Sequence, residues 1–287
     1  MSIKKAFILG AGLGTRLQPL THVLPKPLVP IWNEPLVYHV LRHCMKAGIE
    51  DFAINTHHIP EAWNELFSSG SFEGANIELF HEPILLETGG GIKNISSFIG
   101  DSPILVFNGD IISDIDLNGL IKAHTQSSNL ATLAVKSNGP HCNIAVENDQ
   151  VIDLRNERGI HPGNHQFTGI YCISPEILDL IPSNEKISII PAFIALAKKE
   201  KLGAFNVDQA SWIDIGTIEN YREAHIESPL KNTLNSFISP EATVGENCTI
   251  TNSIIWPNTV IQPNTILEEC IVYSGVPISG KHYQSIL

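Results

Sequence analysis

A glycine-rich turn close to the start of the chain has the residue types that bind phosphate. The string GAGLG at residues 10–14 follows a short apolar run at 6–9 and leads into Thr15 and Arg16. Glycine has no Cβ atom, so the backbone can pass close to an anion with positive φ, and consecutive N–H groups can converge on phosphate oxygens. Arg16 and, further on, Lys26 add positive charge. The turn therefore predicts a phosphate-binding loop after a buried strand.

The residues after this turn separate it from two common phosphate-binding loops. A Walker loop has Lys and then Ser or Thr directly after its last glycine, where this chain has Thr15 and Arg16, and a Rossmann loop runs into an amphipathic helix. Proline interrupts a helix because it lacks an N–H group and its ring clashes with the preceding turn. The prolines that follow here are Pro19, Pro25, Pro27 and Pro30. We therefore expect a long ordered loop that turns Lys26 back toward the phosphates.

Two aspartates are candidates for the acidic part of the site. The apolar residues 103–107 predict a strand at the centre of a sheet, and they end in Asn108, Gly109 and Asp110. A carboxylate at the carboxyl end of a central strand is solvated and faces a ligand, although an aspartate that caps the next element has the same local sequence. The second candidate, Asp214, lies in the string WIDIGT at 212–217, which also fits a strand end with a helix cap.

The alternation of strand and helix patterns predicts the elements that position these residues. We expect strands at 6–9, 51–55, 76–80, 103–107, 130–135, 143–146, 150–154 and 166–171, and helices at 35–47, 60–67 and 218–225. This order indicates an α/β fold with a Rossmann-like, mostly parallel sheet and helices on both faces. Ligands bind such sheets at the carboxyl ends of the strands. Three glycines at 89–91, before a helix expected near Ile92, exceed what a connector needs.

A six-residue repeat marks the end of the chain. The aliphatic residues at this spacing, with one slip, are Ile238, Val244, Ile250, Ile254, Val260, Ile266, Val272 and Ile278. A period of six suits a parallel β-helix whose turns stack aliphatic side chains inward. We therefore divide the chain into a main domain at 1–227, a polar linker at 228–236 and a tail at 237–287. The tail is expected to pack on the main domain or on a neighbouring subunit. In the second case the protein would form a homo-oligomer through its tail.

The composition narrows the class of protein. The chain has 287 residues and a formal net charge of −12, which argues against nonspecific nucleic-acid binding. No apolar run is long enough to cross a bilayer, and the N-terminus leads into a strand instead of a signal peptide, so a cytoplasmic location is expected. Five cysteines without a C-x-x-C pair favour reduced, mostly buried thiols. His57 and His58 would point to opposite faces of a strand, which disfavours a zinc site.

The strings around the turn and Lys26 resemble the signature of the sugar-1-phosphate nucleotidyltransferases, G-x-G-T-R at 12–16 and P-K-P at 25–27. The resemblance extends over residues 3–226, and the tail at 237–280 is similar to the hexapeptide tails of that family. It implies a GT-A-like nucleotidyltransferase domain with a short C-terminal left-handed β-helix. It also implies that a sugar-1-phosphate attacks the α-phosphorus of a nucleoside triphosphate, with Mg²⁺ as cofactor, pyrophosphate as leaving group, and no nucleic-acid or membrane partner.

The resemblance also implies a role for each candidate residue. The implied catalytic residues are Arg16, Lys26 and Asp110, and the implied magnesium ligands are Asp110 and Asp214. The implied nucleotide-binding residues are Leu9, Gly10, Ala11, Gly12, Gly14, Thr15, Glu87, Thr88 and Gly89. The implied sugar-binding residues are Asn108, Thr168, Gly169 and Arg155. Many relatives hold the sugar phosphate with the lysine of an E-K-P segment, which this chain lacks around residues 155–158, so that Arg155 or Arg158 is the candidate substitute.

Several alternatives stay open at this point. A noncatalytic subunit that binds a nucleotide sugar would share the fold, but loss of the two aspartates, Arg16 or Lys26 would mark it, and all four are present. A dinucleotide-dependent oxidoreductase is disfavoured by the prolines after Arg16. The string ETGGGI at 87–92 favours uridylyl transfer to an amino-sugar acid such as N-acetylmuramate. The strings GAGLGTRL and PKPLVPI fit proteins like mannose-1-phosphate guanylyltransferase equally well.

Overall fold

The computed structural model of the chain describes residues 3–183, 185–226 and 236–287. It divides into two compact units, the first made of Met1–Leu13 and Val40–Trp212, the second of Gly14–His39 and Ile213–Leu287. The predicted linker at 228–236 lies outside the described residues, apart from Ser236. The domain boundaries proposed from the sequence stay a prediction.

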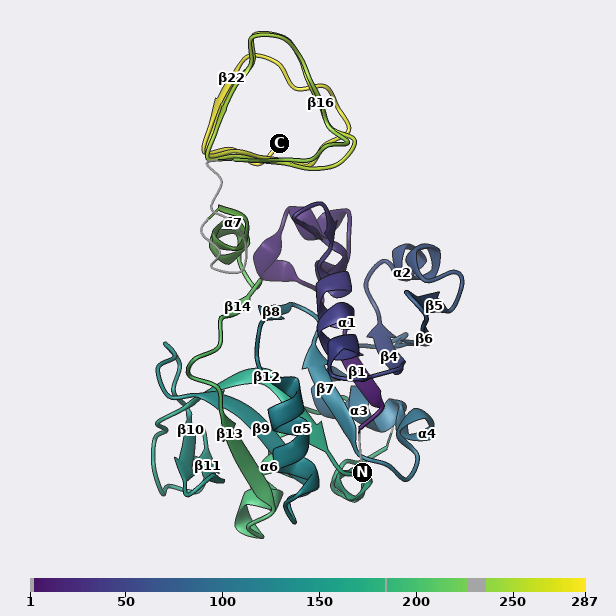
Figure 1. Cartoon of the computed structure of the whole chain (residues 1–287), viewed down its shortest axis with the longest axis vertical. Coiled ribbons are helices and arrows are strands. Elements are labelled where there is room, and N and C mark those ends of the chain that lie inside the picture. The colour runs from purple at the N-terminus through teal and green to yellow at the C-terminus, as the bar shows by residue number, and fades with distance from the viewer. Residues whose placement is uncertain (1–2, 184, 227–235) are drawn as a thin grey trace. The chain divides into compact units, whose positions relative to one another are not determined.

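The first unit has an α/β fold built on one large β-sheet of ten strands (Figure 1). Four neighbouring strands run parallel, as the sequence predicted for the core of the sheet: β7 (Ile104–Asn108), β1 (Lys5–Leu9), β4 (Asp51–Thr56) and β6 (Ala75–His81). The other strands are β5 (Ser71–Phe72), β9 (Ala131–Lys136), β10 (Ile144–Glu147), β11 (Gln150–Leu154), β12 (Gln166–Ile173) and β13 (Leu202–Asn206). Among these, β12 pairs antiparallel with both β7 and β9.

Helices cover both faces of this sheet, as predicted. Side chains of α3 (Glu87–Asn94), α4 (Ser96–Ile99) and α6 (Ile190–Lys198) share one buried cluster with Phe7, Val106 and Leu133. Successive residues of a strand point to opposite faces, so α5 (Leu117–Thr125), whose His124 bonds Thr132, lies on the other face, against β9 and β12 (Figure 1). The first unit also contains α2 (Pro60–Leu66), η4 (Pro175–Leu180) and the part of α1 (Leu36–Lys46) from Val40 on.

The interiors of the central strands β1 and β7 are apolar because helices bury both faces of the sheet. In β7, ILVFN, the first four residues are buried, and in β1 the middle three are. At the carboxyl ends of β7 and β4, polar residues replace the apolar ones, at Asn108 of β7 and at Asn55 and Thr56 of β4. The carboxyl edge of the parallel strands is therefore the place where polar chemistry can occur.

One boundary differs from the prediction. Helix α3 begins at Glu87 and not near Ile92, so the three glycines lie inside the helix instead of before it. Glycine disfavours a helix interior by about 1 kcal/mol relative to alanine, which is why the sequence pattern placed the start too late. Their environment, described below, explains why glycine is needed.

In the second unit, the segment after the glycine-rich turn contains no α-helix before α1, in agreement with its prolines. It forms three single 3₁₀ turns, η1 (Thr15–Leu17), η2 (Leu20–His22) and η3 (Lys26–Leu28), and then a small ladder of β2 (Pro30–Ile31) and β3 (Glu34–Pro35). Gly14 caps η1 with a φ of 63°, a left-handed conformation that favours glycine. The later part of the unit begins at Ile213, inside β14 (Trp212–Asp214), and continues with α7 (Ile218–Ile226).

The tail winds into a coil with parallel strands on three sides, which Figure 1 shows end on as a triangle. Its strands are β15 (Phe237–Ile238), β16 (Thr243–Val244), β17 (Thr249–Thr251), β18 (Ile254–Ile255), β19 (Val260–Ile261), β20 (Ile266–Glu268), β21 (Ile271–Val272) and β22 (Lys281–Tyr283). The guanidinium of Arg222 in α7 donates to the carbonyl oxygens of Glu269 and Asn252, which fastens the coil to α7.

The predicted phase of the repeat was wrong by one residue in the second turn. The ladder pairs Ile238 with Ile255 and Val244 with Ile261, so the residues that continue the inward rows are Ile255, Ile261 and Leu267, not Ile254, Val260 and Ile266. These three residues form the buried core of the coil together with Cys270 and Val272. At each of these places two adjacent residues are aliphatic: Ile254 and Ile255, Val260 and Ile261, and Ile266 and Leu267. The six-residue spacing alone therefore could not show which residue of each pair points inward.

The thiols agree with the prediction: all five cysteines are free, and Cys44, Cys172 and Cys270 are buried. Within the part of the chain that the structure describes, no helix combines the length and the apolar character that crossing a bilayer requires.

Candidate active site

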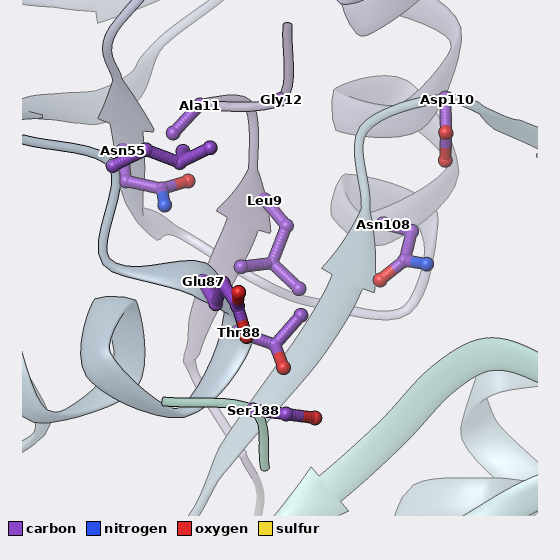
Figure 2. A pocket seen from close by; sticks show the side chains of 10 residues that line it. Leu9, Ala11, Gly12, Asn55, Glu87, Thr88, Asn108, Asp110 and Ser188 are labelled. Atoms are coloured by element: carbon purple, nitrogen blue, oxygen red, sulfur yellow. The ribbon is translucent and has the colours of Figure 1, made fainter. Parts of the chain in front are cut away.

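A cavity of about 340 Å³ lies at the carboxyl edge of the parallel strands (Figure 2). The residues that line it are Leu9, Ala11, Gly12, Asn55, Leu85, Glu87, Thr88, Asn108, Asp110 and Ser188. Seven of them, all but Asn55, Leu85 and Ser188, were candidates from the sequence. In Figure 2, Leu9 lies between the Glu87–Thr88 segment and Asn108, with Asp110 beyond the end of the strand that carries Asn108.

Strand register places the floor of this cavity. Leu9 of β1 pairs with Asn55 of β4 on one side and with Asn108 of β7 on the other, so the three side chains form a row across adjacent parallel strands. Asp110 follows β7 by two residues. The row thus combines an apolar surface at Leu9 with an amide group at each end and a carboxylate, Asp110, beyond the Asn108 end, which suits a ligand with a flat apolar part and a charged part.

The glycine-rich turn is fixed to this floor by its first glycine. The N–H group of Gly10 donates to Oδ1 of Asn55 at 2.8 Å. A Cβ atom added at Gly10 would lie 2.8 Å from the Asn55 carbonyl oxygen, so the close approach of β1 and β4 requires glycine there. At Gly12, by contrast, an added Cβ would meet no atom of the described chain within 4 Å. Gly12 therefore borders open space in the cavity.

The opposite wall combines the start of α3 with the segment at 187–190. Thr88 Oγ1 accepts a hydrogen bond from the N–H group of Ile189 at 3.0 Å, and the N–H groups of Gly89 and Gly90 donate to the Ile187 carbonyl at 2.8 and 3.0 Å. Lys186 lies 3.7 Å from the Glu87 carboxylate, in an exposed ion pair. These contacts hold Thr88 and Ser188 at the cavity, while Gly89 and Gly90 themselves are buried.

Three other candidates come together in the second unit. The Asp214 carboxylate lies 3.6 Å from Nζ of Lys26 and 3.9 Å from the guanidinium of Arg16. Lys26 is buried, with 9% of its side chain exposed, whereas 67% of the Arg16 side chain is exposed. A buried ammonium needs a counter-charge, and Asp214 supplies one. Thr15, the first residue of η1, lies next to Arg16 in the same turn.

Two of the candidates for the sugar site, Thr168 and Gly169, have different surroundings. Thr168 is buried and its hydroxyl donates to the Ala134 carbonyl at 2.8 Å, so that group is already engaged. Gly169 has a φ of 79°, and a Cβ there would lie 2.5 Å from Nδ2 of Asn108, so glycine at this position leaves room for the Asn108 side chain at the cavity.

The two arginines of the 155–158 segment differ in their contacts. Arg158 donates to the Ile152 carbonyl at 2.5 Å, which directs its side chain back onto the preceding strand, β11. Arg155 lines a second cavity, of about 160 Å³, together with His141, Asn143 and Gln166. The loop that carries both is held by Asp153, whose carboxylate accepts N–H groups of Arg158 and Ile160. Burial would raise the pKa of Asp153, but these backbone N–H groups outweigh it and lower the pKa.

Sequence reasoning missed three lining residues, of which Asn55 had a detectable signal. It ends a predicted parallel strand, and a polar residue at that place faces the ligand edge for the same reason as Asp110. Leu85 and Ser188 lie in irregular segments, and no local pattern pointed to them. They reach the cavity only through the packing of the 187–190 segment against α3.

The charges of the cavity bear on the metal that the sequence predicted. Its lining contains the carboxylates of Glu87 and Asp110 and no lysine, arginine or histidine among the described residues. A polyphosphate would need added positive charge beside them. No set of three or more His, Cys, Asp or Glu side chains in residues 3–183, 185–226 and 236–287 forms a metal cage of its own. Magnesium takes only one or two carboxylates beside phosphate oxygens and water, so the hard oxygens of Asp110 fit this ion.

The fold and the cavity define an α/β domain with a cavity at the carboxyl edge of its parallel strands, the edge at which such sheets bind ligands. Residues 5–229 match the model of the nucleotidyl transferase family, and the chain belongs to this family. It is 33% identical over 224 residues to mannose-1-phosphate guanylyltransferase of Mycobacterium tuberculosis, a match that covers 75% of this chain and 62% of the relative. It is 31% identical over 227 residues to N-acetylmuramate alpha-1-phosphate uridylyltransferase of Neisseria meningitidis, covering 77% of this chain and 96% of the relative.

Solved structures show the same fold. UDP-glucose pyrophosphorylase of Acinetobacter baumannii superposes with a TM-score of 0.67 at 22% identity, covering 77% of this chain and 92% of that one. The inositol-1-phosphate CTP transferase of T. maritima superposes with a TM-score of 0.65 at 16% identity, with the same coverage. At these identities the likeness establishes the fold only.

Proposed function

We propose that the chain is a sugar-1-phosphate nucleotidyltransferase, which makes a nucleoside diphosphate sugar and pyrophosphate from a nucleoside triphosphate and a sugar-1-phosphate. The single observation that supports this most is the cavity at the carboxyl edge, where the open glycine Gly12, the Leu9 surface and the Asp110 carboxylate meet. Membership of the nucleotidyl transferase family supports the reaction class.

In this proposal the base lies on Leu9 and the Glu87–Thr88 wall, and the phosphates lie along the glycine-rich turn. A nonbridging oxygen of the sugar-1-phosphate attacks the α-phosphorus, the bond from that phosphorus to the β-phosphate oxygen breaks, and pyrophosphate leaves with both electrons. The attacking oxygen is already anionic, so no general base is required. Arg16 and Lys26 stabilise the negative charge of the triphosphate, and the backbone N–H groups of the turn orient it.

Asp110 and Asp214 are the proposed ligands of Mg²⁺, which when bound neutralises charge on the phosphates. Asn108, Gly169 and Thr168 form the proposed wall for the sugar. Arg155 is the proposed cation that replaces the E-K-P lysine, because this residue lines a cavity while Arg158 donates to a backbone carbonyl. The proposed hand of the C-terminal coil is left, and its three parallel sides support a β-helix of that type.

The names of the relatives supply candidates for the base and the sugar. These relatives transfer guanylyl and uridylyl groups, so GTP and UTP are the preferred nucleotides. The test is release of pyrophosphate with Mg²⁺, for each of four nucleoside triphosphates combined with the 1-phosphates of mannose, glucose, N-acetylglucosamine and N-acetylmuramate. Release in one combination, with the matching nucleotide sugar detected by mass spectrometry, is the expected result. No release in any combination, with tight binding of a nucleotide sugar, would favour a noncatalytic regulatory subunit instead.

A further inference from the structure

The structure contains a fully buried carboxylate that none of the proposed steps uses. Glu82 follows β6 directly, and none of its surface is exposed. Burying a carboxylate without partners is costly, and a carboxylate of this kind is normally paired with a cation or fully hydrogen-bonded. Within the described part of the chain, its bonds go to an amide side chain and to a backbone N–H group instead of to a cation.

The bonds of Glu82 join the two walls of the cavity. Its Oε1 accepts from Nδ2 of Asn55 at 2.8 Å, and its Oε2 accepts from the N–H group of Leu86 at 2.9 Å. The other end of the same Asn55 amide, Oδ1, accepts from the N–H group of Gly10. The chain of hydrogen bonds therefore runs from the glycine-rich turn through Asn55 and Glu82 to the residue just before Glu87 and Thr88.

The direction of these bonds is fixed at both ends. The N–H groups of Gly10 and Leu86 can only donate, so the side chains between them must present an acceptor to each and must still bond to one another. Asn55 meets this with its oxygen toward Gly10 and its NH₂ group toward Glu82. Glu82 must then accept on both oxygens, which a carboxylate does and a glutamine cannot.

Two neighbours reinforce this pair. Nδ1 of His57 lies 2.7 Å from the Glu82 carbonyl oxygen, and because a carbonyl only accepts, that nitrogen carries the proton. A Cβ atom added at Gly91 would lie 3.0 Å from Nδ2 of Asn55 and 3.1 Å from Oε1 of Glu82. Glycine at this position of α3 therefore leaves room for the pair.

We infer that Asn55 and Glu82 are a positioning pair that sets the spacing between the phosphate-binding turn and the Thr88 wall, and so tunes binding of the nucleoside triphosphate. Glu82 is absent from the cavity lining, so its effect is transmitted through Asn55 and Leu86. This inference rests on the proposed function for the identity of the ligand.

The test is an exchange of the two functional groups. Glu82→Gln leaves either Gly10 or Leu86 without an acceptor, and Asn55→Asp places two carboxylates face to face. The double variant Asn55→Asp with Glu82→Gln restores every bond with the central one reversed: the new carboxylate at position 55 would accept from Gly10 and from the new amide at position 82, whose oxygen would accept from Leu86. We expect KM for the nucleoside triphosphate to rise about tenfold or more in each single variant, since small displacements of a binding group have effects of this size. In the double variant it returns to within about threefold, while KM for the sugar-1-phosphate changes less.

The chain offers a matched control at the amino end of the same two strands. Nδ2 of Asn76 in β6 donates to Oδ1 of Asp51 in β4 at 2.7 Å, an amide–carboxylate bond of the same chemistry far along the strands from the cavity. Asp51→Asn is expected to leave both KM values unchanged. This control separates loss of an amide–carboxylate bond in general from loss of the bond at the cavity.

The outcomes distinguish this inference from the proposed function. An active wild type whose Glu82→Gln variant keeps its KM for the nucleotide, or whose folded double variant is no better than the singles, overturns the positioning pair alone. A wild type that releases no pyrophosphate overturns the proposed function. The pair is then judged by the rise in melting temperature on adding GTP or UTP: a rise that the single variants lose and the double variant regains supports it, and any other pattern overturns it.

Discussion

The two glycine-rich segments of this chain have similar compositions but differ in that only the turn contains a glycine, Gly12, that borders open space. In the turn at 10–14, Gly12 borders open space and Gly14 takes a left-handed conformation. In α3, Gly89, Gly90 and Gly91 are all buried, and an added Cβ atom would lie between 2.6 and 3.0 Å from the nearest atom at each. Gly12 alone borders open space, whereas an added Cβ at Gly10 or Gly14 would lie 2.8 Å from Asn55 or Thr21, so those two glycines, like the three of α3, leave room for the protein itself.

The neighbours of each glycine explain the difference. The Cβ positions of Gly89 and Gly90 point at the carbonyl groups of Ser188, Ile187 and Glu185, so α3 packs against the backbone of the 185–189 segment at a distance that any side chain would prevent. That close packing in turn brings Ser188 and Thr88 to the cavity. A buried glycine can therefore support a binding site as a spacer without touching the ligand.

The largest effect is expected for Asp110→Asn, which removes a charge from the cavity and changes neither glycine segment. Because a neutral amide is a poor magnesium ligand and stabilises no cation, kcat for pyrophosphate release should fall by about 10³-fold, the scale seen when a group that stabilises transition-state charge is removed. Circular dichroism and the melting temperature should match the wild type. Retained turnover would show that Asp110 has no part in the chemistry.

Gly90→Ala should have the largest effect on stability. The new methyl group would lie 2.6 Å from the Glu185 carbonyl oxygen and 2.8 Å from Cβ of Leu86, so the helix or the 185–189 segment must move. Overpacking of this kind costs about 1–3 kcal/mol, and we expect a decrease in melting temperature of about 3–10 °C. Gly275→Ala is the control, because a Cβ there meets no described atom within 4 Å. Equal melting temperatures for the two variants would contradict the packing role.

Gly91→Ala should have a smaller effect on stability. Gly91 lies in α3 but is close to Asn55, whose side chain bonds the glycine-rich turn, so this position connects the two segments. Its methyl group would press on the ends of two side chains, Asn55 and Glu82, at 3.0 and 3.1 Å, and these can move by a few tenths of an ångström. We expect a loss of about 1 kcal/mol in the free energy of unfolding, measured by urea denaturation. Because those side chains join the turn to the Thr88 wall, KM for the nucleotide should also rise by about threefold. A change in stability with no change in KM would separate the pair from ligand binding.

The sequence was sufficient for the features that depend on local pattern. The parallel core strands, the prolines that prevent a helix after Arg16 and the inward spacing of the first coil turn all follow from residue type and period. The cavity also brought together seven of the predicted residues, because strand ends such as Leu9, Asn108 and the nearby Asp110 meet at one edge in any parallel sheet.

The features that depend on distant packing could not be predicted. The start of α3 at Glu87 requires the 185–189 segment, almost 100 residues further on, to explain why helical glycines are tolerated there. The phase of the coil depended on two sides of five residues, one from Ile250 to Ile255, where Ile254 is equally aliphatic, and one from Leu267 to Val272. The role of Glu82 depends on two hydrogen-bond partners at Asn55 and Leu86, of which the first lies on another strand.

The most direct test of the contrast between the two segments is Gly12→Ala, with KM for the nucleoside triphosphate and the melting temperature measured on the same preparation. Since an added Cβ at Gly12 meets no described atom within 4 Å, the free protein should keep its melting temperature or gain slightly from the lower entropy of the unfolded chain. The methyl group should nevertheless occupy space that the phosphates need, and KM should rise by about tenfold or more. An unchanged KM would contradict the assignment of the turn to phosphate, and a large fall in melting temperature would show that Gly12, like Gly90, is there for packing.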